Sequence, residues 1–313
     1  MNLLYISSSL PSGKPSPIVA SQASGLEQNS LTVDFFLISS KGLIGYLKEI
    51  INLRKFINNK TFDFYHAHYG LSALVATLAG AKPLIVSLMG SDVMVGGWQK
   101  WLIKRFAKHY WAATITKSLE LAKLVGEQYC TVIPNGVDLE LFQSIQKVQC
   151  REQLKLDLNK TYILFAANPK RPEKNFTLAQ NAFHKVDLPN AELIYLQDIP
   201  HNEISIWMNA VDVVCLSSLW EGSPNVIKEA MACNRPIVST NVGDVEWLFG
   251  NEPGHYIASF EVDDYANKLK LAVDFSNNNE STNGRERIKQ LGLDSQTIAK
   301  RIITIYKEAL NEV

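Results

Sequence analysis

The stretch SSLWEGSPNVIKEAMACNRPIVSTNVGDVEWLF (217–249) carries most of the information in this chain. Two carboxylates, Glu221 and Glu229, stand eight positions apart in it, on either side of a predicted helix start. Ser223 is a favourable helix cap and Pro224 suits the first helical position. We therefore expect Glu221 in the loop before the helix, Glu229 within the helix about one and a half turns from its start, and both carboxylates facing one cavity.

The two faces of this predicted helix differ in character. The expected polar face consists of Asn225, Lys228, Glu229 and Ala232. The apolar stripe that would pack on a sheet consists of Val226, Ile227, Ala230 and Met231. A helix start offers unpaired backbone N–H groups and a partial positive charge, which favour a phosphate, and a carboxylate deeper in the helix can accept hydrogen bonds from a sugar diol. The pattern predicts a nucleotide-sugar site.

The position of the helix along the chain supports this prediction. An apolar run, VDVVCLSS (211–218), precedes it, and PIVST (236–240) follows within a few residues. Both runs are typical of buried strands. The helix is therefore expected to begin at the carboxyl end of a strand, where open α/β sheets bind their ligands.

Glu221-x7-Glu229, followed by EAMACNRPIVST and VGDVEWL, resembles the donor-binding motif of retaining glycosyltransferases of family 4 that build bacterial surface polysaccharides. The resemblance implies a hexosyltransferase that moves a sugar from a nucleoside diphosphate sugar, with UDP favoured, to a hydroxyl of a glycan or lipid-linked glycan. It implies that Glu229 holds the ribose hydroxyls. It also implies that the sugar and phosphates meet Glu221 and the segment Gly222, Ser223, Pro224 and Asn225.

Short β-branched runs alternate with helical patterns along the chain, which is typical of a parallel sheet with crossover helices. Strands are expected at 2–7, 31–38, 62–66, 83–88, 111–116 and 129–133, and then at 161–167, 191–196, 211–216, 236–240 and 255–258. The family resemblance implies an α/β fold with two Rossmann-like domains facing a cleft, called GT-B. We expect an N-terminal acceptor-side domain at 1–145, a nucleotide-sugar-binding domain at 146–294, and a C-terminal helix at 295–313 that crosses back to the first domain.

A basic loop, NPKRPEKNF (168–176), follows the expected strand at 161–167. Arg171 and Lys174 match the family's pair of cations that hold the donor diphosphate. Breaking a sugar–phosphate bond puts negative charge on the nucleoside diphosphate, and fixed cations lower the barrier to that step. The chain contains no Asp-x-Asp pair. We therefore expect no metal and no other cofactor, with Arg171, Lys174 and the helix start in the metal's place.

The first half offers further candidates for the acceptor side of the cleft. FYHAHYG (64–70) resembles the family's His-x-His segment and contributes His68, and VSLMGSDV (86–93) contributes Asp92, although Met89 stands where the family usually has His. Asp92 after Gly-Ser is also an ordinary helix cap, and Asn135 in PNGVD is expected to shape the cleft. Gly13 and Lys14 lie where the family has a Gly-Gly loop.

Composition limits the partners and the compartment. The 313 residues carry zero formal net charge, which disfavours a nucleic-acid partner. The four cysteines lack CxxC spacing and are typical of reduced cytosolic thiols. No apolar run approaches the ~20 residues of a membrane-spanning helix. We expect a cytoplasmic protein.

The segment GGWQKWLIKRFAKHYW (96–111) combines lysines with tryptophans. This composition is compatible with peripheral binding to the anionic inner face of the cytoplasmic membrane. The segment is also typical of a crossover helix with its aromatics in the core and its lysines in water, and this ordinary alternative is the favoured one.

Two other functions stay open on the sequence. A catalytically silent sugar-nucleotide-binding or scaffold protein would explain Met89 and the poor Gly loop. A nucleotide-sugar 2-epimerase shares the same two-domain fold, but it needs an acid/base pair that the sequence does not display.

Overall fold

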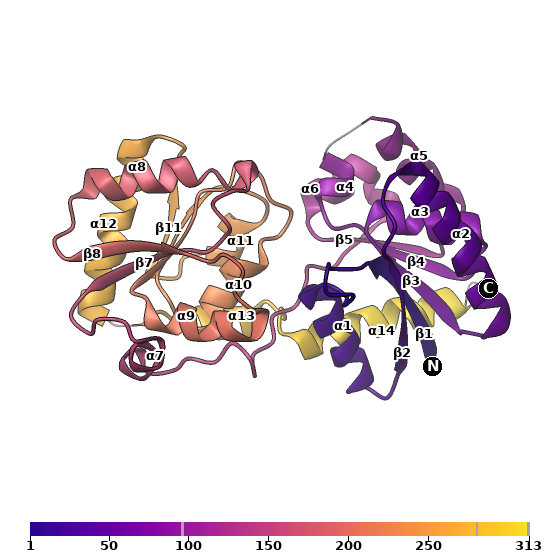
Figure 1. The fold of residues 1–313 in the computed structure, drawn as a ribbon, viewed down its shortest axis with the longest axis horizontal. Coiled ribbons are helices and arrows are strands. Elements are labelled where there is room, and N and C mark those ends of the chain that lie inside the picture. The colour runs from indigo at the N-terminus through magenta and orange to yellow at the C-terminus, as the bar shows by residue number, and fades with distance from the viewer. Residues whose placement is uncertain (95–96, 280, 312–313) are drawn as a thin grey trace. The chain divides into compact units, whose positions relative to one another are not determined.

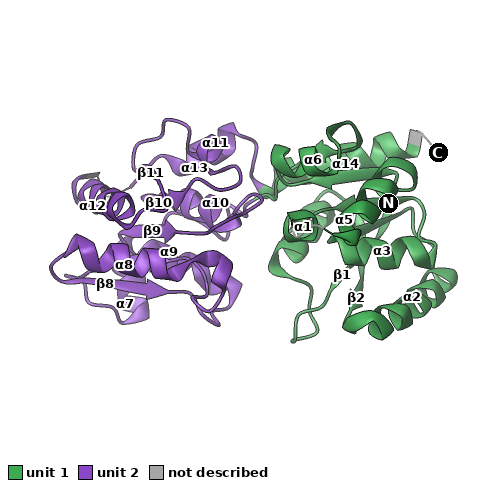
Figure 2. Cartoon of the chain, turned by 90° about the horizontal axis from the view of Figure 1, so that it is seen from above, with its two compact units in different colours: residues 1–136, 295–313 green, residues 137–294 purple. Residues whose placement is uncertain are grey.

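The computed structural model describes residues 1–94, 97–279 and 281–311 and divides the chain into two compact units. Unit 1 comprises residues 1–136 and 295–313, and unit 2 comprises residues 137–294 (Figure 2). Each unit is a parallel sheet covered by helices, as the alternation of apolar runs and helical patterns predicts.

The sheet of unit 1 has six parallel strands in the order β2-β1-β3-β4-β5-β6 (Figure 1). Its strands are β1 (Asn2–Ser8), β2 (Thr32–Ile38), β3 (Phe64–His68), β4 (Leu84–Ser87), β5 (Ala113–Thr116) and β6 (Thr131–Val132). The central strands are buried on both faces, which is why they read as continuous apolar runs in the sequence.

Helices cover both faces of this sheet. They are α1 (Pro17–Glu27), α2 (Gly42–Asn59), α3 (Gly70–Ala79), α4 (Ser91–Met94), α5 (Trp98–His109), α6 (Leu119–Val125), the 3₁₀ turn η1 (Glu127–Tyr129) and α14 (Ser295–Asn311). One core joins Leu53 of α2, Ala76 of α3 and Ile103 of α5 to Leu4 of the sheet. Neighbouring side chains along a strand point to opposite faces. On the other face α14 packs against α1, and Tyr306 reaches β3.

The sheet of unit 2 has five parallel strands in the order β11-β10-β9-β7-β8. These are β7 (Thr161–Phe165), β8 (Ala191–Tyr195), β9 (Val213–Leu216), β10 (Ile237–Thr240) and β11 (His255–Ala258). Its helical segments are α7 (Lys147–Leu154), η2 (Pro172–Lys174), α8 (Phe176–Val186), η3 (His201–Glu203), α9 (Ile204–Ala210), α10 (Asn225–Ala232), α11 (Val245–Phe249), α12 (Val262–Asn279) and α13 (Gly284–Gln290). Strands β7 and β9 are neighbours, so the segments that follow them meet at the carboxyl edge of the sheet.

The boundary between the units lies nine residues before the expected position, at 136/137 instead of 145/146. The segment 137–145 belongs to unit 2 because polar side chains of that unit bind its backbone. The guanidinium of Arg285 donates to the carbonyls of Leu139 (2.8 Å) and Phe142 (2.7 Å), and the amide of Ile145 donates to Asn209 Oδ1 (2.9 Å). These partners are distant in sequence, so the local pattern does not reveal them.

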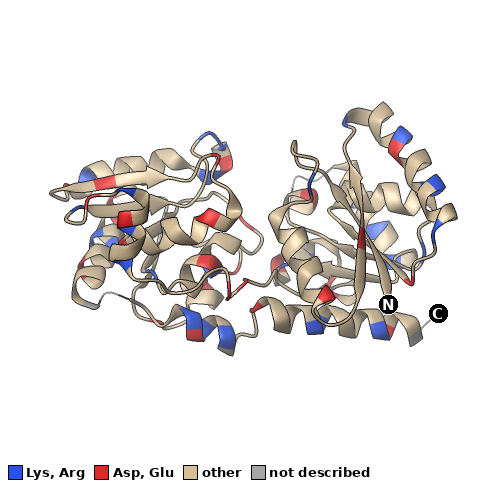
Figure 3. Ribbon diagram, turned by 60° about the horizontal axis from the view of Figure 1, so that its bottom comes forward, with Lys and Arg blue, Asp and Glu red and all other residues tan. Residues whose placement is uncertain are grey.

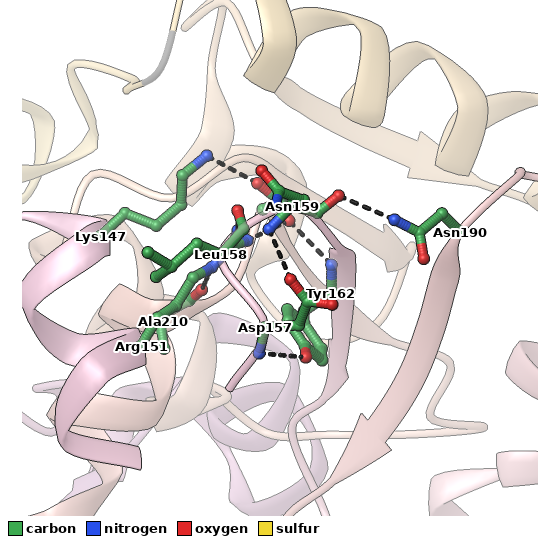
Figure 4. A network of polar contacts seen from close by, with 9 residues as sticks. Lys147, Arg151, Asp157, Leu158, Asn159, Tyr162, Asn190 and Ala210 are labelled. Atoms are coloured by element: carbon green, nitrogen blue, oxygen red, sulfur yellow. Dashed lines mark hydrogen bonds and ion pairs between the residues drawn. The ribbon is translucent and has the colours of Figure 1, made fainter. Parts of the chain in front are cut away.

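A buried ionic network joins α7 to the sheet of unit 2 (Figure 4). Asp212 accepts hydrogen bonds from Arg151 (2.6 Å), Lys147 (2.7 Å) and the backbone amide of Tyr162 (2.8 Å). The side chains of Arg151 and Asp212 are 4% and 5% exposed, so each charge needs the other to remain buried. Helix α7, which follows the boundary between the units, is therefore fixed as a part of unit 2.

The eleven expected strands are all present, with ends that move by at most a few residues. All four cysteines are free thiols. Across the described residues, every helix is too short or too polar to cross a bilayer.

Candidate active site

Helix α10 begins one residue later than the sequence suggests. Pro224 is the residue before the first helical turn, with φ −69° and ψ 113°, and the helix starts at Asn225. The prediction that Ser223 caps the helix is wrong, because its hydroxyl accepts a hydrogen bond from Lys228 Nζ at 3.0 Å instead. Gly222, Ser223 and Pro224 are nevertheless buried in the loop that leads into the helix, as a site at the helix start requires.

Lys228 does not lie on an open face. The side chains of Lys228 and Ala232 are fully buried, so the expected polar face is covered at both positions. Burial lowers the pKa of Lys228 to about 8, while the nearby carboxylates of Asp244 and Glu229 act in the opposite direction. Burial also raises the pKa of Asp244, against the effect of Lys228. The opposite charges of Lys228 and Asp244 thus favour each other electrostatically in this buried region.

Two loops at the carboxyl edge of the sheet pack directly on each other. Gly243 has φ +60°, and a Cβ built there would lie 2.5 Å from the carbonyl oxygen of Gly222. Only glycine fits this approach, because a side chain would strain the backbone and collide with the loop 221–223. The VGD segment therefore fixes the position of the loop that carries Glu221.

Glu221 forms an ion pair with Lys174, which comes from the turn η2 after β7. The hydroxyl of Ser218 also donates to Glu221 Oε1, at 2.7 Å. The two charged side chains are 12% and 15% exposed, for Lys174 and Glu221 respectively. Further bonds tie the same loops together, since the Ser217 hydroxyl donates to the carbonyls of Lys174 (3.1 Å) and Asn175 (2.9 Å).

Arg171 lies differently from Lys174. Its guanidinium pairs with Glu173 at 2.5 Å, and its side chain is 58% exposed. The sequence predicts that both cations face one diphosphate. In the structure only Lys174 contacts the carboxylate loop, and Arg171 is bound to its own turn.

Glu229 is largely buried, with an 11% exposed side chain, and contacts a histidine that the sequence analysis missed. His201 Nε2 lies 3.1 Å from Glu229 Oε1. The hydrogen bond to Glu229 raises the pKa of His201, while partial burial opposes it. The imidazole also packs edge-on against Phe142, with 5.5 Å between ring centroids. His201 follows Pro200 in a polar turn, and no sequence signal pairs that turn with Glu229.

A buried polar atom at the helix start has no partner: Asn225 Oδ1 accepts no hydrogen bond from any residue that the structure describes. A buried acceptor without a donor is costly in free energy. The side chain is therefore suited to a donor group supplied by a ligand.

His66 and His68 of unit 1 lie in the core and not on an open rim. His68 is 2% exposed, and burial, followed by the charge of Lys117, lowers its pKa to about 3. His66 is fully buried between the hydroxyls of Tyr306 (2.6 Å) and Ser87 (2.9 Å). Both imidazoles are thus neutral, and they stack with 4.4 Å between their centroids.

Asp92 has a structural role in the fold. Its carboxylate is 4% exposed and accepts hydrogen bonds from the amides of Gly70 (2.9 Å), Gly90 (2.8 Å) and Met89 (3.2 Å). These bonds fix the starts of α3 and α4. The helix-cap alternative therefore describes Asp92 better than a contact with substrate.

The remaining candidates of unit 1 lie in two separate loops. Gly13, with φ +73°, and Lys14 occupy an exposed turn, closed by a bond of 2.8 Å from the amide of Leu10 to the carbonyl of Lys14. Asn135 is half-buried and lines a small pocket with Ile18 of α1 and Ile298 of α14.

In residues 1–94, 97–279 and 281–311, no group of three or more His, Cys, Asp or Glu side chains is arranged to hold a metal ion.

Two family models match the chain, one in each half. The model called Glycosyltransferase Family 4 matches residues 17–141, and the model called Glycosyl transferases group 1 matches residues 173–274. Together they cover most of both sheets.

Named relatives match this chain at 26–27% identity. The chain is 27% identical over 215 residues to TuaC of Bacillus subtilis (strain 168), a glycosyltransferase named for teichuronic acid biosynthesis. That match covers 60% of this chain and 55% of TuaC, so the chain spans about half the length of that relative. It is 26% identical over 284 residues to the UDP-Gal:alpha-D-GlcNAc-diphosphoundecaprenol alpha-1,3-galactosyltransferase of Escherichia coli, a match that covers 74% of this chain and 72% of the relative.

Solved structures share the fold at lower identity. Sucrose-phosphate synthase from Thermosynechococcus elongatus has a TM-score of 0.83 at 15% identity and is matched over 100% of this chain and 99% of its own. Anabaena HepE in complex with UDP-glucose has a TM-score of 0.77 at 17% identity, with both chains covered in full at 100%. The motif, the two family models and the fold of both units agree, and the chain therefore belongs to glycosyltransferase family 4, with the GT-B fold.

Proposed function

We propose that the protein transfers a hexose from a UDP-sugar to a hydroxyl of a glycan or lipid-linked glycan, with retention of configuration and without a metal ion. The observation that carries the proposal is the junction of Lys174 and Glu221 beside the start of α10, with Glu229 on the next turn of that helix. The names of two similar proteins support UDP and a lipid-linked acceptor, since one uses UDP-Gal on a diphosphoundecaprenol acceptor and another was solved with UDP-glucose.

The residues of the site match the charges of such a donor. Backbone N–H groups of the segment 222–225 and the positive end of α10 favour the diphosphate. Lys174 stands at the same edge and would neutralise the charge that develops on UDP as the sugar–phosphate bond breaks. Arg171 would join it only after leaving Glu173. In this arrangement Glu221 is released from Lys174 and accepts hydrogen bonds from the sugar.

Glu229 is the proposed ribose contact. Its Oε1 is bound to His201 at 3.1 Å. A carboxylate has a second oxygen with its own acceptor sites. Two vicinal ribose hydroxyls can therefore bind Glu229 while His201 holds its orientation.

The proposed reaction places the protein inside the cell, at the membrane surface. Its four free cysteines are typical of a reducing compartment. Contact of the segment 96–111 with the inner face of the membrane would bring a lipid-linked acceptor to the enzyme. Residue 96 lies outside the described residues, and α5 begins at Trp98.

The donor site is tested by calorimetric titration of UDP in buffer that contains excess chelator. We expect the wild-type protein to bind UDP under these conditions. Glu229→Ala should weaken binding by roughly 2–3 kcal/mol, because two ribose hydroxyls lose a charged acceptor. Glu203→Ala, which removes an exposed carboxylate on the turn that carries His201, is the matched control and should leave affinity unchanged.

Each part of the proposal has its own contradicting outcome. Equal UDP affinity in folded Glu229→Ala protein would place the nucleotide elsewhere. Binding that is lost in chelator and restored by magnesium would show that a metal takes part. UDP binding without release of UDP from any sugar donor, in the presence of lipid-linked acceptors, would favour the catalytically silent alternative.

A further inference from the structure

Helix α2 leaves an apolar stripe on the outer surface of unit 1. Leu43, Ile44, Leu47 and Ile51 are 79%, 84%, 53% and 57% exposed. Their spacing places them on one side of the helix, while Leu53 on the opposite side is buried in the core. Single exposed apolar side chains are ordinary, but a contiguous stripe marks an interaction surface.

Helix α5 presents two tryptophans in the same manner. Trp98 and Trp101 are each 64% exposed, while Ile103 and Ala107 hold the helix to the core. Lys104, Arg105 and Lys108 are also exposed. At 100° per residue, Arg105 and Lys108 fall on the same side of the helix as Trp101. The alternative in which the aromatic side chains of this segment are all in the core is therefore wrong for these two tryptophans.

The two helices cover the same face of the sheet. Leu53 of α2, Ala76 of α3 and Ile103 of α5 share one core, and α3 contacts both other helices. Figures 1 and 2 both show α3 between α2 and α5. Leu78, near the end of α3, is also 52% exposed. We call the surface formed by Leu43, Ile44, Leu47, Ile51, Trp98 and Trp101 the α2–α5 face.

The exposed charges of α2 and α5 have one sign. The zero net charge of the chain conceals a difference between the units, since unit 1 has sixteen Lys and Arg against nine Asp and Glu, and unit 2 has fifteen against twenty-two (Figure 3). Glu49 is the single acidic residue within α2 and α5, and it is 5% exposed and accepts a bond from the Ser40 hydroxyl at 2.7 Å. The two helices therefore offer cations beside the apolar face, without exposed carboxylates of their own.

This combination identifies the class of partner. Aliphatic side chains and tryptophans beside lysines and arginines are the composition of helices that lie in the interface of a bilayer. The cations attract anionic headgroups, and the apolar side chains enter the boundary between headgroups and acyl chains. A soluble acidic partner would use the cations but would not explain four exposed aliphatic side chains in one stripe.

We propose that the α2–α5 face docks unit 1 on an anionic lipid bilayer, with α2 as a second contact beside α5. The proposal extends the proposed function to the surface on which the enzyme works. It does not depend on the transfer reaction, since lipid binding needs neither donor nor turnover. Failure of one is therefore distinguishable from failure of the other.

The test is flotation of the 313-residue chain with vesicles of phosphatidylglycerol and phosphatidylcholine, compared with vesicles of phosphatidylcholine alone. We expect binding to the anionic vesicles at low salt and loss of binding as salt rises. The double variant Lys104→Glu with Lys108→Glu should weaken binding at least about tenfold, given roughly fivefold per surface cation. The double variant Leu43→Ser with Ile44→Ser should also weaken binding at least about tenfold, because two apolar side chains no longer enter the boundary between headgroups and acyl chains.

The controls separate docking from misfolding and from general surface effects. All four substituted side chains are exposed, so both variants should retain UDP affinity. Leu271→Ser with Lys270→Glu on α12 of unit 2, where Leu271 is 47% exposed, is the matched control and should leave vesicle binding unchanged. A blue shift of tryptophan emission on vesicle addition should disappear in Trp98→Phe with Trp101→Phe.

Three outcomes would overturn the proposal. Wild-type protein that ignores anionic vesicles at low salt has no such surface. Equal binding by the wild type and both double variants would place the contact elsewhere. The third outcome is a wild-type protein that is a dimer and does not bind vesicles, and that becomes a monomer in the double variant Leu43→Ser with Ile44→Ser. This result would show that a second copy of the chain covers the face.

Discussion

The contact between His201 and Glu229 in the candidate site makes the stability of the fold depend on pH. The hydrogen bond to Glu229 raises the pKa of His201 above its ordinary value near 6.5. The folded state therefore binds the proton more tightly than the unfolded state. The pair contributes its full stabilisation below the unfolded pKa, and that contribution is lost as the pH rises through the folded pKa.

His201→Ala should therefore reduce the free energy of unfolding more at pH 5.5 than at pH 9. We expect a difference of about 1 kcal/mol, the upper scale for a partly exposed ion pair. Urea unfolding at the two pH values measures it. In a Glu229→Gln background the effect of His201→Ala should no longer depend on pH. An unchanged pH dependence in that background would assign it to another group near His201, such as Asp138.

Elements meet at the carboxyl edge of the second sheet through their loops. The loop 221–223 before α10 and the loop 242–244 before α11 touch at the backbone of Gly222 and Gly243. Buried Lys228 supports the first loop through the Ser223 hydroxyl, and its charge is balanced by Asp244 of the second. The start of α10 is therefore positioned by the loop 242–244, which follows the next strand, β10.

Gly243→Ala should disturb both the fold and the donor site. The positive φ alone costs of the order of 1–3 kcal/mol, and the collision with the Gly222 carbonyl must also move the loop 221–223. We expect UDP affinity to fall at least about tenfold, measured by calorimetry at a temperature where the variant is folded.

Gly80→Ala is the matched control for backbone strain. Gly80 has φ +89°, but a Cβ there meets nothing within 4 Å. The free energy of unfolding of this variant should fall by an amount comparable to the backbone strain in Gly243→Ala, and its UDP affinity should be unchanged. Equal UDP affinity in both variants would show that the loop contact does not position the nucleotide.

At the scale of the whole chain, the donor candidates form one continuous segment with its own core. Arg171, Lys174, Glu221 and Glu229 all lie in unit 2, which spans 137–294 without interruption. Its core includes Phe165, Val213 and Leu269 and is separate from that of unit 1. Unit 1 is assembled from two distant segments, because α14 returns to it.

The fragment 137–294 should fold alone and bind UDP, with affinity within about tenfold of the full chain, because every proposed nucleotide contact is retained. Circular dichroism and calorimetry test this, and the same fragment with Glu229→Ala is the control for specific binding. A folded fragment with no measurable UDP affinity would place essential donor contacts in unit 1.

The sequence by itself determined where the strands lie and how strands and helices alternate along the chain. Runs such as 161–165 and 213–216 are apolar over their whole length, and a strand buried on both faces needs no distant information to be recognised. The motif around Glu221 and Glu229 also predicted a candidate site at a strand end, because short-range spacing sets the loop and the helix.

Only the tertiary structure decided which distant groups meet. The contact of His201 with Glu229, the burial of Lys228 near Asp244 and the assignment of 137–145 to unit 2 all join segments far apart in the chain. The exposure of Ile44 and Trp101 likewise depends on which side of each helix the core occupies. Local patterns fix backbone preference, but burial and pairing depend on where the rest of the chain lies.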